Sequence, residues 1–382
     1  MADHDTEVAV VGGGVVGCAV ARRLTLCGVA TTLLEAGPAL GLGASGTNSG
    51  ILHTGFDSVP GELETELILR AAELRGQEAA GLGAPIVRCG AVLRPRDETE
   101  RAAVARLAAG ARANGVEVEL RADASLDVPG ESITDPVAFT GALAAQAQAA
   151  GAEVRTDAAV GALAAAPGGG ISVELEGGER LRVRGVANCA GLRADAVAAG
   201  VGKPPFEIYP RKGEFLVFAQ PAEPLTQILL PVPSAAGKGV LVFPTVDGHV
   251  IAGPTARDRR DKDDWSVEAD AAELILPRAR RMLPALADAE PVAAYAGLRP
   301  AGRGVNYAIG PSHVLTGLVN VAAVRSTGLS ASLAIGEHVT GLLAQAAGLT
   351  LRPPAQAAPL PTRPPEVPWW RRAAERSQRA AS

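Results

Sequence analysis

The stretch Thr6–Glu35, TEVAVVGGGVVGCAVARRLTLCGVATTLLE, decides the fold that this sequence predicts. Its first part, Glu7–Val11, is a short apolar run with β-branched residues at alternate positions, which is typical of a buried strand. Val15–Cys27 then has helical composition without proline, and Thr31–Leu34 is expected to be a second buried strand. The order strand, helix, strand predicts a βαβ unit of a parallel sheet.

Three glycines and one acid stand where a dinucleotide-binding βαβ unit needs them. Gly12, Gly14 and Gly17 form GxGxxG after the first strand. Gly12 permits a tight turn, Gly14 leaves room for a pyrophosphate, and Gly17 lets helix and strand pack closely. The helix N-terminus attracts phosphate, and Glu35 at the end of the second strand can accept a hydrogen bond from a ribose hydroxyl. The alternative is a structural glycine-rich turn, which would not need the acid in this register.

Composition indicates a globular protein of moderate size. The 382 residues are enough for two domains and a sizeable core. An apolar fraction of 47% and a charged fraction of 20% fit a soluble globular chain. The formal net charge of −5 argues against a nucleic-acid partner.

Neither a targeting signal nor a membrane span is expected. The N-terminal MADHDTEV lacks a basic segment, and there is no run of about 18 apolar residues. The 4 cysteines contain no CxxC pair, so the sequence predicts no metal site. They are Cys18, Cys27, Cys89 and Cys189. This pattern predicts a reduced, cytoplasmic protein.

A glycine-rich loop, AGPALGLGASGTNSGILHTGFD, follows the second strand at Ala36–Asp57. Loops of this length inside a compact domain are usually functional. Its glycines allow a ligand to approach Ser45, Asn48, Ser49 and His53 closely. We therefore expect this loop to lie against a bound ligand.

The rest of the chain changes character near Pro204: helices alternate with strands before it, whereas closely spaced strands after it indicate antiparallel sheet. The expected strands are Ile86–Leu93, Val116–Leu120, Glu153–Thr156, Ile171–Leu175, Leu181–Val183, Gly185–Cys189, Phe206–Pro210, Glu214–Phe218, Gly239–Pro244, Val250–Ala252 and Leu318–Val324. The expected helices are Gly61–Gly76, Asp97–Asn114, Thr134–Ala150, Val267–Leu283 and Leu329–Ala346.

Four segments, taken in order, carry a family resemblance. They are GxGxxG with Glu35, then SGTNSGILHTGFD, then YPRKGEFLVF with KGVLVFPTVDGHVIAGPTA, and finally AGLRPA with VAAVRSTGLSAS. Over about residues 6–345 the chain resembles the FAD-dependent oxidoreductases of the D-amino-acid-oxidase-like superfamily. It is most similar to the branch of glycerol-3-phosphate oxidases and dehydrogenases and L-2-hydroxyglutarate oxidases. The resemblance implies an α/β fold, with a Rossmann-like FAD-binding domain and a discontinuous antiparallel-sheet substrate domain.

The implied domains are interleaved in sequence. The FAD-binding domain would hold residues 1–85, 132–203 and 292–350, the substrate domain 86–131 and 204–291, and a Pro-rich, basic tail 351–382. PWWRRAAER at 368–376 mixes tryptophan with arginine, which would suit peripheral contact with the inner face of a membrane. The alternatives are a frayed tail and a tail that packs in an oligomer.

Oxidation of a secondary alcohol by a flavin needs a base, a cation that holds an anionic substrate, and a positive pole near the flavin pyrimidine. The resemblance assigns the base to His53 and the cation to Arg299, because a guanidinium pairs well with phosphate or carboxylate. The alternatives are a histidine that packs against the cofactor and a surface arginine. The other histidines are weaker candidates; they are His4, His249, His313 and His338.

Other residues are secondary candidates for contacts with substrate or FAD. The substrate candidates are Ser49, Ser330, Ser326 and Lys262, with Arg303 as a second anion-binding residue. Lys262 lies in RDRRDKDD, whose alternating charges are also typical of a solvated loop. The alternative role of Ser326 and Ser330 is helix capping. Besides the glycines and Glu35, the implied FAD contacts are Ser45, Asn48, Ser49, Val160, Ala190, Gly191, Gly328, Leu329 and Ser330.

The sequence thus predicts FAD-dependent oxidation of a small anionic 2-hydroxy compound. Glycerol 3-phosphate is the first choice and L-2-hydroxyglutarate the second, while an amine or amino acid is a third because the same fold supports both reactions. The electrons would pass to oxygen or to a membrane quinone. Two rival hypotheses are a non-catalytic flavoprotein scaffold and a nicotinamide-only dehydrogenase. The oligomeric state is left open.

Overall fold

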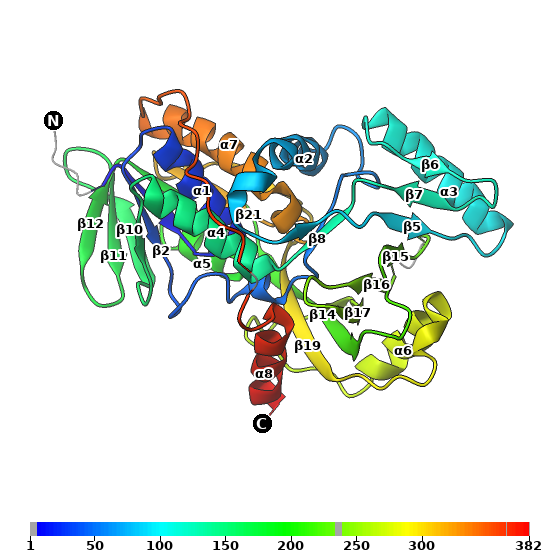
Figure 1. Ribbon diagram of the computed structural model, residues 1–382. Helices are drawn as coiled ribbons and strands as arrows, with labels where there is room; N and C mark the ends of the chain where they lie inside the picture. Colours follow the sequence, from blue (N-terminus) through cyan, green and yellow to red (C-terminus); the bar gives the residue numbers. More distant parts are fainter. Residues whose placement is uncertain (1–5, 234–238, 364, 382) are drawn as a thin grey trace.

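The computed structural model describes residues 6–233, 239–363 and 365–381, so His4 lies outside the described residues. Within them the chain forms a mostly parallel sheet of 6 strands, a mostly antiparallel sheet of 9 strands and two sheets of 3 strands. Figure 1 shows the two large sheets side by side, each with its own helices. The expected α/β class with a second, antiparallel unit is confirmed.

The six-stranded sheet has the predicted βαβ unit at its centre. In spatial order its strands are β20 (Ala308–Pro311), β21 (Leu318–Ala322), β13 (Gly185–Asn188), β1 (Val8–Val11), β2 (Thr31–Leu34) and β9 (Glu153–Arg155). β1 pairs in parallel with β2 on one side and with β13 on the other. All three strands are buried along their whole length, as expected for central strands of a parallel sheet that is covered on both faces.

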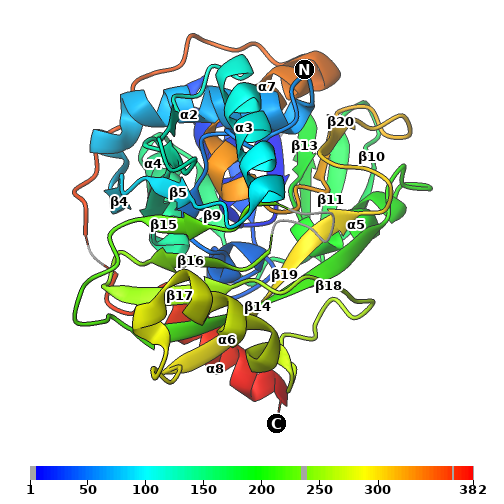
Figure 2. The same ribbon diagram turned by 90° about the vertical axis from the view of Figure 1, so that its right-hand side faces the viewer.

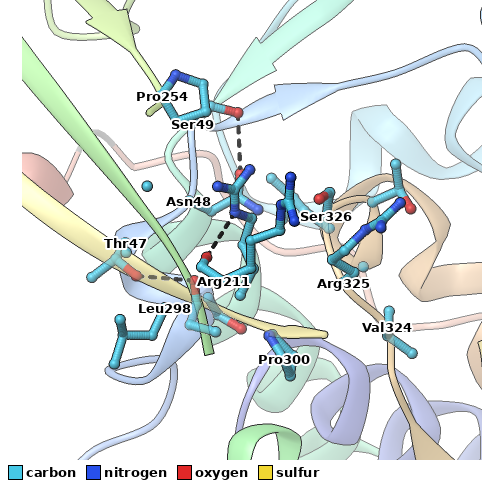
Figure 3. Close-up of a pocket in the computed structure, with 18 of the residues that line it drawn as sticks. Thr47, Asn48, Ser49, Arg211, Pro254, Leu298, Pro300, Val324, Arg325 and Ser326 are labelled. Atoms are coloured by element: carbon cyan, nitrogen blue, oxygen red, sulfur yellow. Dashed lines mark hydrogen bonds between the residues drawn. The ribbon is translucent and has the colours of Figure 1, made fainter. Parts of the chain in front are cut away.

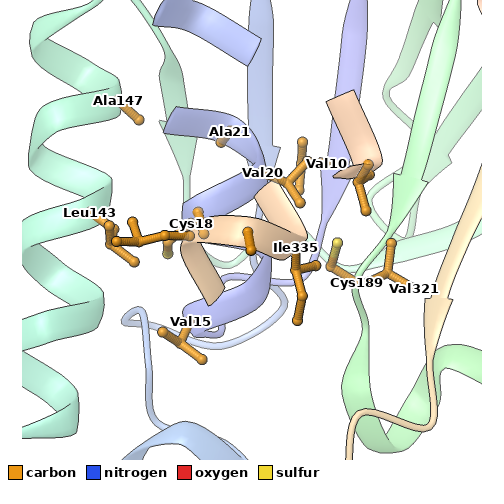
Figure 4. Close-up of a cluster of buried hydrophobic side chains, with 14 of the residues drawn as sticks. Val10, Val15, Cys18, Val20, Ala21, Leu143, Ala147, Cys189, Val321 and Ile335 are labelled. Atoms are coloured by element: carbon orange, nitrogen blue, oxygen red, sulfur yellow. The ribbon is translucent and has the colours of Figure 1, made fainter. Parts of the chain in front are cut away.

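One face of this sheet packs against helices. They are α1 (Val15–Leu26), α4 (Pro136–Ala149) and α7 (Gly328–Ala347), with α2 (Leu63–Leu82) packed on α7. Val10, Cys18, Leu143 and Ile335 bring β1, α1, α4 and α7 into one core (Figure 4). Burial of a side chain the size of Leu143 stabilises the fold by about 1.5–3 kcal/mol. A Cβ at Gly17 would lie 1.9 Å from the Gly12 carbonyl oxygen, so glycine is required where α1 crosses the turn.

The small sheets complete this half of the molecule. One is the antiparallel set β10 (Val160–Ala165), β11 (Ile171–Leu175) and β12 (Arg180–Val183); the other contains β3 (Ile51–Leu52), β8 (Ser132–Thr134) and β4 (Ile86–Val87). Ile171 and Val173 of β11 pack with Ala9 and Val11 on the face of β1 that points away from α1. The predicted hairpin at 171–183 is therefore confirmed, and it covers the second face of the parallel sheet.

The nine-stranded sheet forms the other half. Its strands are β18 (Arg257–Asp258), β14 (Ile208–Ala219), β17 (His249–Gly253), β16 (Leu241–Pro244), β15 (Ile228–Leu230), β5 (Ala91–Leu93), β7 (Leu126–Val128), β6 (Glu119–Leu120) and β19 (Ala293–Gly302), the last paired with β14. Its helices are α3 (Glu98–Ala113), α6 (Ala271–Met282) and α8 (Trp369–Ala381). Alternate residues of β14 serve opposite faces, because Leu216 and Phe218 pack toward α6 while Phe215 and Val217 pack with α3 and α8. Figure 2 shows α6 lying across β14 and β17.

Several expected elements have different bounds. The strands expected at Phe206–Pro210 and Glu214–Phe218 are one strand, β14, which begins at Ile208, because the link between them stays extended and pairs with β19. Ile86–Leu93 is two strands in different sheets, since Gly90 turns the chain with φ of +69°. The helix expected at Val267–Leu283 begins only at Ala271. A short helix, α5 (Ala194–Ala199), was not expected.

The sheets also bear on the domain boundaries. Every strand of the six-stranded sheet comes from the segments expected for the FAD-binding domain, but β19 does not join it. Pairs between β19 and β14 run from Gly302 with Ile208 to Ala293 with Val217. We therefore propose that the last domain boundary lies after Gly302 rather than before residue 292.

The tail differs most from expectation. Its first part lies along the FAD-binding half, where Arg352 donates to the Cys27 carbonyl and Leu360 to the Gly81 carbonyl, each by a main-chain bond. α8 then packs on β19, with Trp369 1% and Trp370 4% exposed. The prediction of membrane contact through 368–376 is not supported, because both indoles are buried in the core of the chain itself. Among the described residues, every helix is too short or too polar to span a bilayer.

Candidate active site

A cavity of about 1190 Å³ lies between the two large sheets. Gly12 and Cys189, which follow β1 and β13, line it, so it opens at the carboxyl ends of adjacent parallel strands. Phe215 of β14 and Leu298 of β19 line its other side. Sites for a single small molecule usually measure about 300–1,000 Å³. This cavity therefore has room for a dinucleotide and a small substrate together.

The end of the cavity at α1 fits a pyrophosphate. Gly12 has φ of +106°, and a Cβ there would lie 2.5 Å from the Cys189 carbonyl oxygen. Gly14 lines the cavity at the start of α1 and, as a glycine, offers no side chain of its own to cap the helix. The Ser45 hydroxyl accepts a hydrogen bond of 3.0 Å from the Val15 amide. The N-terminus of α1, its positive pole and a nearby hydroxyl thus face space that only glycine leaves open.

Glu35 lies where a ribose would be recognised. Its carboxylate lines the cavity and accepts hydrogen bonds from the Gly13 amide at 2.6 Å and the Gly37 amide at 2.8 Å. These bonds fix the orientation of the carboxylate and leave further lone pairs as acceptors. Ala190 and Gly191 line the same region after β13. The residues present therefore fit the adenosine and diphosphate part of FAD.

The loop Ala36–Asp57 and the start of α7 line the middle of the cavity. Asn48, Ser49 and His53 line it from the loop, and Gly328 and Leu329 from α7. The first turn of α7 carries no acidic residue, and the only carboxylate that the described residues bring to its N-cap is Glu64, which accepts from the Thr327 hydroxyl. These residues fit the ring of a flavin and the side at which its reduced form becomes anionic.

His53 is paired with a buried carboxylate. Its Nδ1 lies 2.9 Å from Glu131 Oε2, and the side chain of Glu131 is fully buried. Glu131 Oε1 accepts from the Thr54 amide at 2.7 Å and from the Thr54 hydroxyl at 2.9 Å. A carboxylate beside Nδ1 assigns the ring proton to Nδ1 and leaves Nε2 as the proton acceptor.

The main chain of His53 is also held on both sides. Its amide donates to Ser330 Oγ at 2.8 Å, and its carbonyl accepts from Arg75 Nη2 at 2.8 Å. Arg75 also donates to the Ser330 carbonyl. Burial lowers the pKa of Arg75 to about 10, and Glu131 opposes this effect. Ser330 thus holds the main chain of His53; it is not among the residues that line the cavity, and its predicted contacts with substrate and FAD stay predictions.

Arg299 reaches the cavity from β19. Its guanidinium donates to three main-chain carbonyls, those of Arg211 at 3.0 Å, Lys212 at 3.2 Å and Thr255 at 2.9 Å. Burial, and then repulsion by Arg211 and Arg325, lowers its pKa to about 10, so the group stays charged at neutral pH. Three carbonyl partners fix its position without neutralising it.

Other predicted residues lie elsewhere or are already paired. Lys262 lines the cavity, but its ammonium lies 2.7 Å from both carboxylate oxygens of Asp195. Arg303 is exposed, pairs with Glu207 at 3.0 Å and does not line the cavity, so it is a surface arginine. Val160 begins β10 and is not among the residues that line the cavity, and its expected contact with adenine stays a prediction.

The sequence reasoning missed Glu131, Arg75, Arg211 and Arg325. Glu131 lies between β7 and β8 and belongs to no motif, and Arg75 lies inside α2, where a charged residue is normally expected to face solvent. Arg211 and Arg325 stand inside quoted segments, PRKGEF and VRSTGL, but no spacing relates them. Figure 3 shows Arg211, Arg325 and Ser326 together with Asn48 and Ser49 at the cavity. The pairing of His53 with Glu131, and the places of Arg211 and Arg325 at the cavity, could be recognised only once the fold was known.

A family model and several known proteins match most of the chain. The family model described as FAD dependent oxidoreductase (DAO) matches residues 7–342. A glycerol 3-phosphate dehydrogenase from Caloramator mitchellensis is 29% identical over 362 residues, which cover 88% of this chain and 73% of that protein. A glycerol 3-phosphate oxidase from Mycoplasma pneumoniae is 28% identical over 361 residues, with 88% and 94% covered.

Solved structures show the same architecture. The dithionite-reduced L-α-glycerophosphate oxidase from Mycoplasma pneumoniae with FAD bound superposes with a TM-score of 0.86 at 26% identity, covering 94% of this chain and 99% of that one. A glycine oxidase from Bacillus cereus ATCC 14579 superposes with a TM-score of 0.78 at 20% identity, covering 89% and 95%. The second likeness concerns the fold alone.

Proposed function

Because this chain belongs to the family of FAD-dependent oxidoreductases, we propose that it oxidises the secondary hydroxyl of glycerol 3-phosphate, with oxygen or a quinone as electron acceptor. The observation that carries the proposal is the pairing of His53 with buried Glu131 in a cavity that also holds the charged guanidinium of Arg299. Relatives named glycerol 3-phosphate dehydrogenase and glycerol 3-phosphate oxidase support this substrate.

Each residue of the site has a separate role in this proposed reaction. Arg299 binds the phosphate and, with its position fixed by three carbonyls, orients the substrate. His53 accepts the hydroxyl proton at Nε2, while Glu131 holds the ring and stabilises the imidazolium that forms. When bound, FAD supplies the hydride acceptor. The N-terminus of α7 stabilises negative charge beside Gly328 and Leu329.

L-2-Hydroxyglutarate is the second candidate substrate. Relatives named L-2-hydroxyglutarate dehydrogenase include one from Escherichia coli strain K12, 27% identical over 293 residues, which cover 70% of this chain and 69% of that protein. A guanidinium such as Arg299 pairs with carboxylate as readily as with phosphate. Both substrates require the same base and the same cation.

Anaerobic bleaching of the flavin in the purified protein tests the proposal. The panel contains glycerol 3-phosphate, L-2-hydroxyglutarate, L-lactate, glycine and sarcosine, and we expect rapid bleaching by glycerol 3-phosphate. Admission of oxygen then distinguishes an oxidase from a dehydrogenase. Bleaching by L-2-hydroxyglutarate or an amine alone would replace the substrate. A protein that holds FAD but is bleached by none of them would favour the scaffold hypothesis.

A further inference from the structure

Glu64 stands in the first turn of α2, yet its carboxylate reaches the start of α7. The two helices pack against each other (Figure 1). Glu64 Oε1 accepts a hydrogen bond of 2.5 Å from the hydroxyl of Thr327, the N-cap of α7, and Oε2 accepts from the side-chain amide of Asn306. All three residues line the cavity. A carboxylate is therefore held at the edge of the cavity, beside the helix end that fits the pyrimidine side of a flavin.

The partners of this carboxylate are neutral. Within the described part of the chain, Glu64 forms no ion pair with a basic side chain, and Thr327 and Asn306 are its side-chain hydrogen-bond donors. Its charge acts on nearby groups: burial raises the pKa of the Tyr307 hydroxyl, and the charge of Glu64 adds to that rise. When a ligand displaces water from the cavity, the lower dielectric strengthens the effect of this charge on its surroundings.

The bond to Glu64 also decides what Thr327 does for α7. Threonine at an N-cap usually accepts a hydrogen bond from the first turn of its helix. The Thr327 hydroxyl makes no such bond, because it donates to Glu64, and Tyr307 must then be the donor in the 2.8 Å bond between the two hydroxyls. Gly328 and Leu329 begin this turn and line the cavity. Thr327 thus leaves the first amides of α7 to a ligand, with a negative charge beside them.

We propose that Glu64 sets the reduction potential of the bound flavin, because its carboxylate opposes the positive pole of α7 and keeps the potential lower than the helix alone would set it. The side of the flavin that fits the start of α7 is the side that becomes anionic on reduction. The helix pole favours this charge, and a carboxylate beside the pole disfavours it. A lower potential makes the reduced flavin a stronger electron donor to its acceptor. The proposal concerns the cofactor, so it holds or fails whichever substrate the protein oxidises.

Redox titration of the FAD-loaded protein against a reference dye tests the proposal without substrate. Glu64→Gln keeps the size of the side chain and an oxygen that can accept from Thr327, but it removes the charge. At one fixed potential, the ratio of reduced to oxidised flavin should rise about tenfold in Glu64→Gln, which corresponds to about 30 mV for a two-electron couple. Glu64→Lys inverts the charge and should raise the ratio further, whereas Glu64→Asp keeps the charge and should stay near wild type.

Glu66→Gln is the matched control. It removes the same charge from the same turn of α2, at an exposed residue that does not line the cavity, and it should leave the ratio unchanged. Thr327→Val separates charge from hydrogen bonding, because it removes both hydroxyl contacts and leaves the carboxylate of Glu64 in place. This variant should melt at a lower temperature, while its flavin potential should change less than that of Glu64→Gln.

Two results would overturn the proposal. A ratio at the wild-type value in both Glu64→Gln and Glu64→Lys would show that the charge of Glu64 does not act on the flavin. An equal shift in Glu66→Gln would assign the effect to the net charge of the protein. A purely structural role of Glu64 would lower the melting temperature of Glu64→Gln and leave its flavin potential unchanged. Failure of the proposed function looks different, because glycerol 3-phosphate would then not bleach the flavin while the redox titration still showed the shift.

Discussion

Replacement of Glu131 by glutamine changes the partner of His53 while keeping the size of the side chain. In the native site one oxygen accepts from Thr54 twice, at 2.7 and 2.9 Å, and the other lies 2.9 Å from His53 Nδ1. Glutamine has one oxygen only. If that oxygen stays on Thr54, the NH₂ group faces Nδ1, and the ring proton must move to Nε2. His53 then no longer presents a proton acceptor to the substrate.

The expected loss of rate in Glu131→Gln follows from the role of His53 as the base. A positioned general base contributes about 10²- to 10⁴-fold to a rate, and loss of the correct tautomer forfeits this contribution. We expect the rate of flavin reduction by glycerol 3-phosphate to fall at least about 100-fold in Glu131→Gln. Because Arg299 is untouched, the affinity for an anion such as sulfate should stay within about threefold of wild type, a difference below about 1 kcal/mol.

Anaerobic stopped-flow absorbance of the flavin measures the reduction rate directly. Glu207→Gln is the control, since Glu207 is exposed, forms an ion pair with Arg303, and does not line the cavity. Glu131→Asp keeps the charge and should recover part of the rate. A flavin-loaded Glu131→Gln protein that is reduced within about threefold of the wild-type rate would refute the role given to this pair, because the base term is at least about 100-fold.

Other expectations follow from single residues or contacts. Since the pKa of Arg299 is lowered to about 10, its charge is lost as the pH rises through that value. KM for an anionic substrate should therefore rise between pH 9 and pH 11, and a constant KM would contradict the binding of the anion by Arg299. Trp369→Phe removes the 3.0 Å hydrogen bond from Nε1 to the Asn48 carbonyl, so its affinity for FAD should fall by about 1 kcal/mol. Trp370→Phe is the control, because it loses a hydrogen bond to Asp247 instead. Equal FAD affinities of the two variants in a fluorescence titration would show that the loop does not depend on α8. Gly17→Ala puts a Cβ 1.9 Å from the Gly12 oxygen and should lower stability by about 1–3 kcal/mol in chemical unfolding, whereas Gly110→Ala, with nothing within 4 Å, should not destabilise the protein.

Short-range sequence patterns were sufficient to predict the central elements of the FAD-binding half. Strands β1 and β2 are buried on both faces and the glycines stand at fixed offsets, so residues 6–35 predicted their own structure and their ligand. The tail shows the limit of such signals. Its tryptophans and arginines read as a surface-binding segment, yet Trp369 finds partners in Asn48 and Asp135, far away in the chain.

By itself, the sequence determined the βαβ unit, the dinucleotide site and the family, because each depends on short-range order along one stretch of chain. Only the tertiary structure decided what surrounds the reacting groups. Glu131 meets His53 across 78 positions, and Arg325, which follows β21, lines the same cavity as Arg299 of β19. Such contacts leave no periodic trace, since a lone charged residue looks the same in the sequence whether it points to solvent or into a cavity. The physical distinction is burial and the charge of the neighbours, and the fold alone sets both.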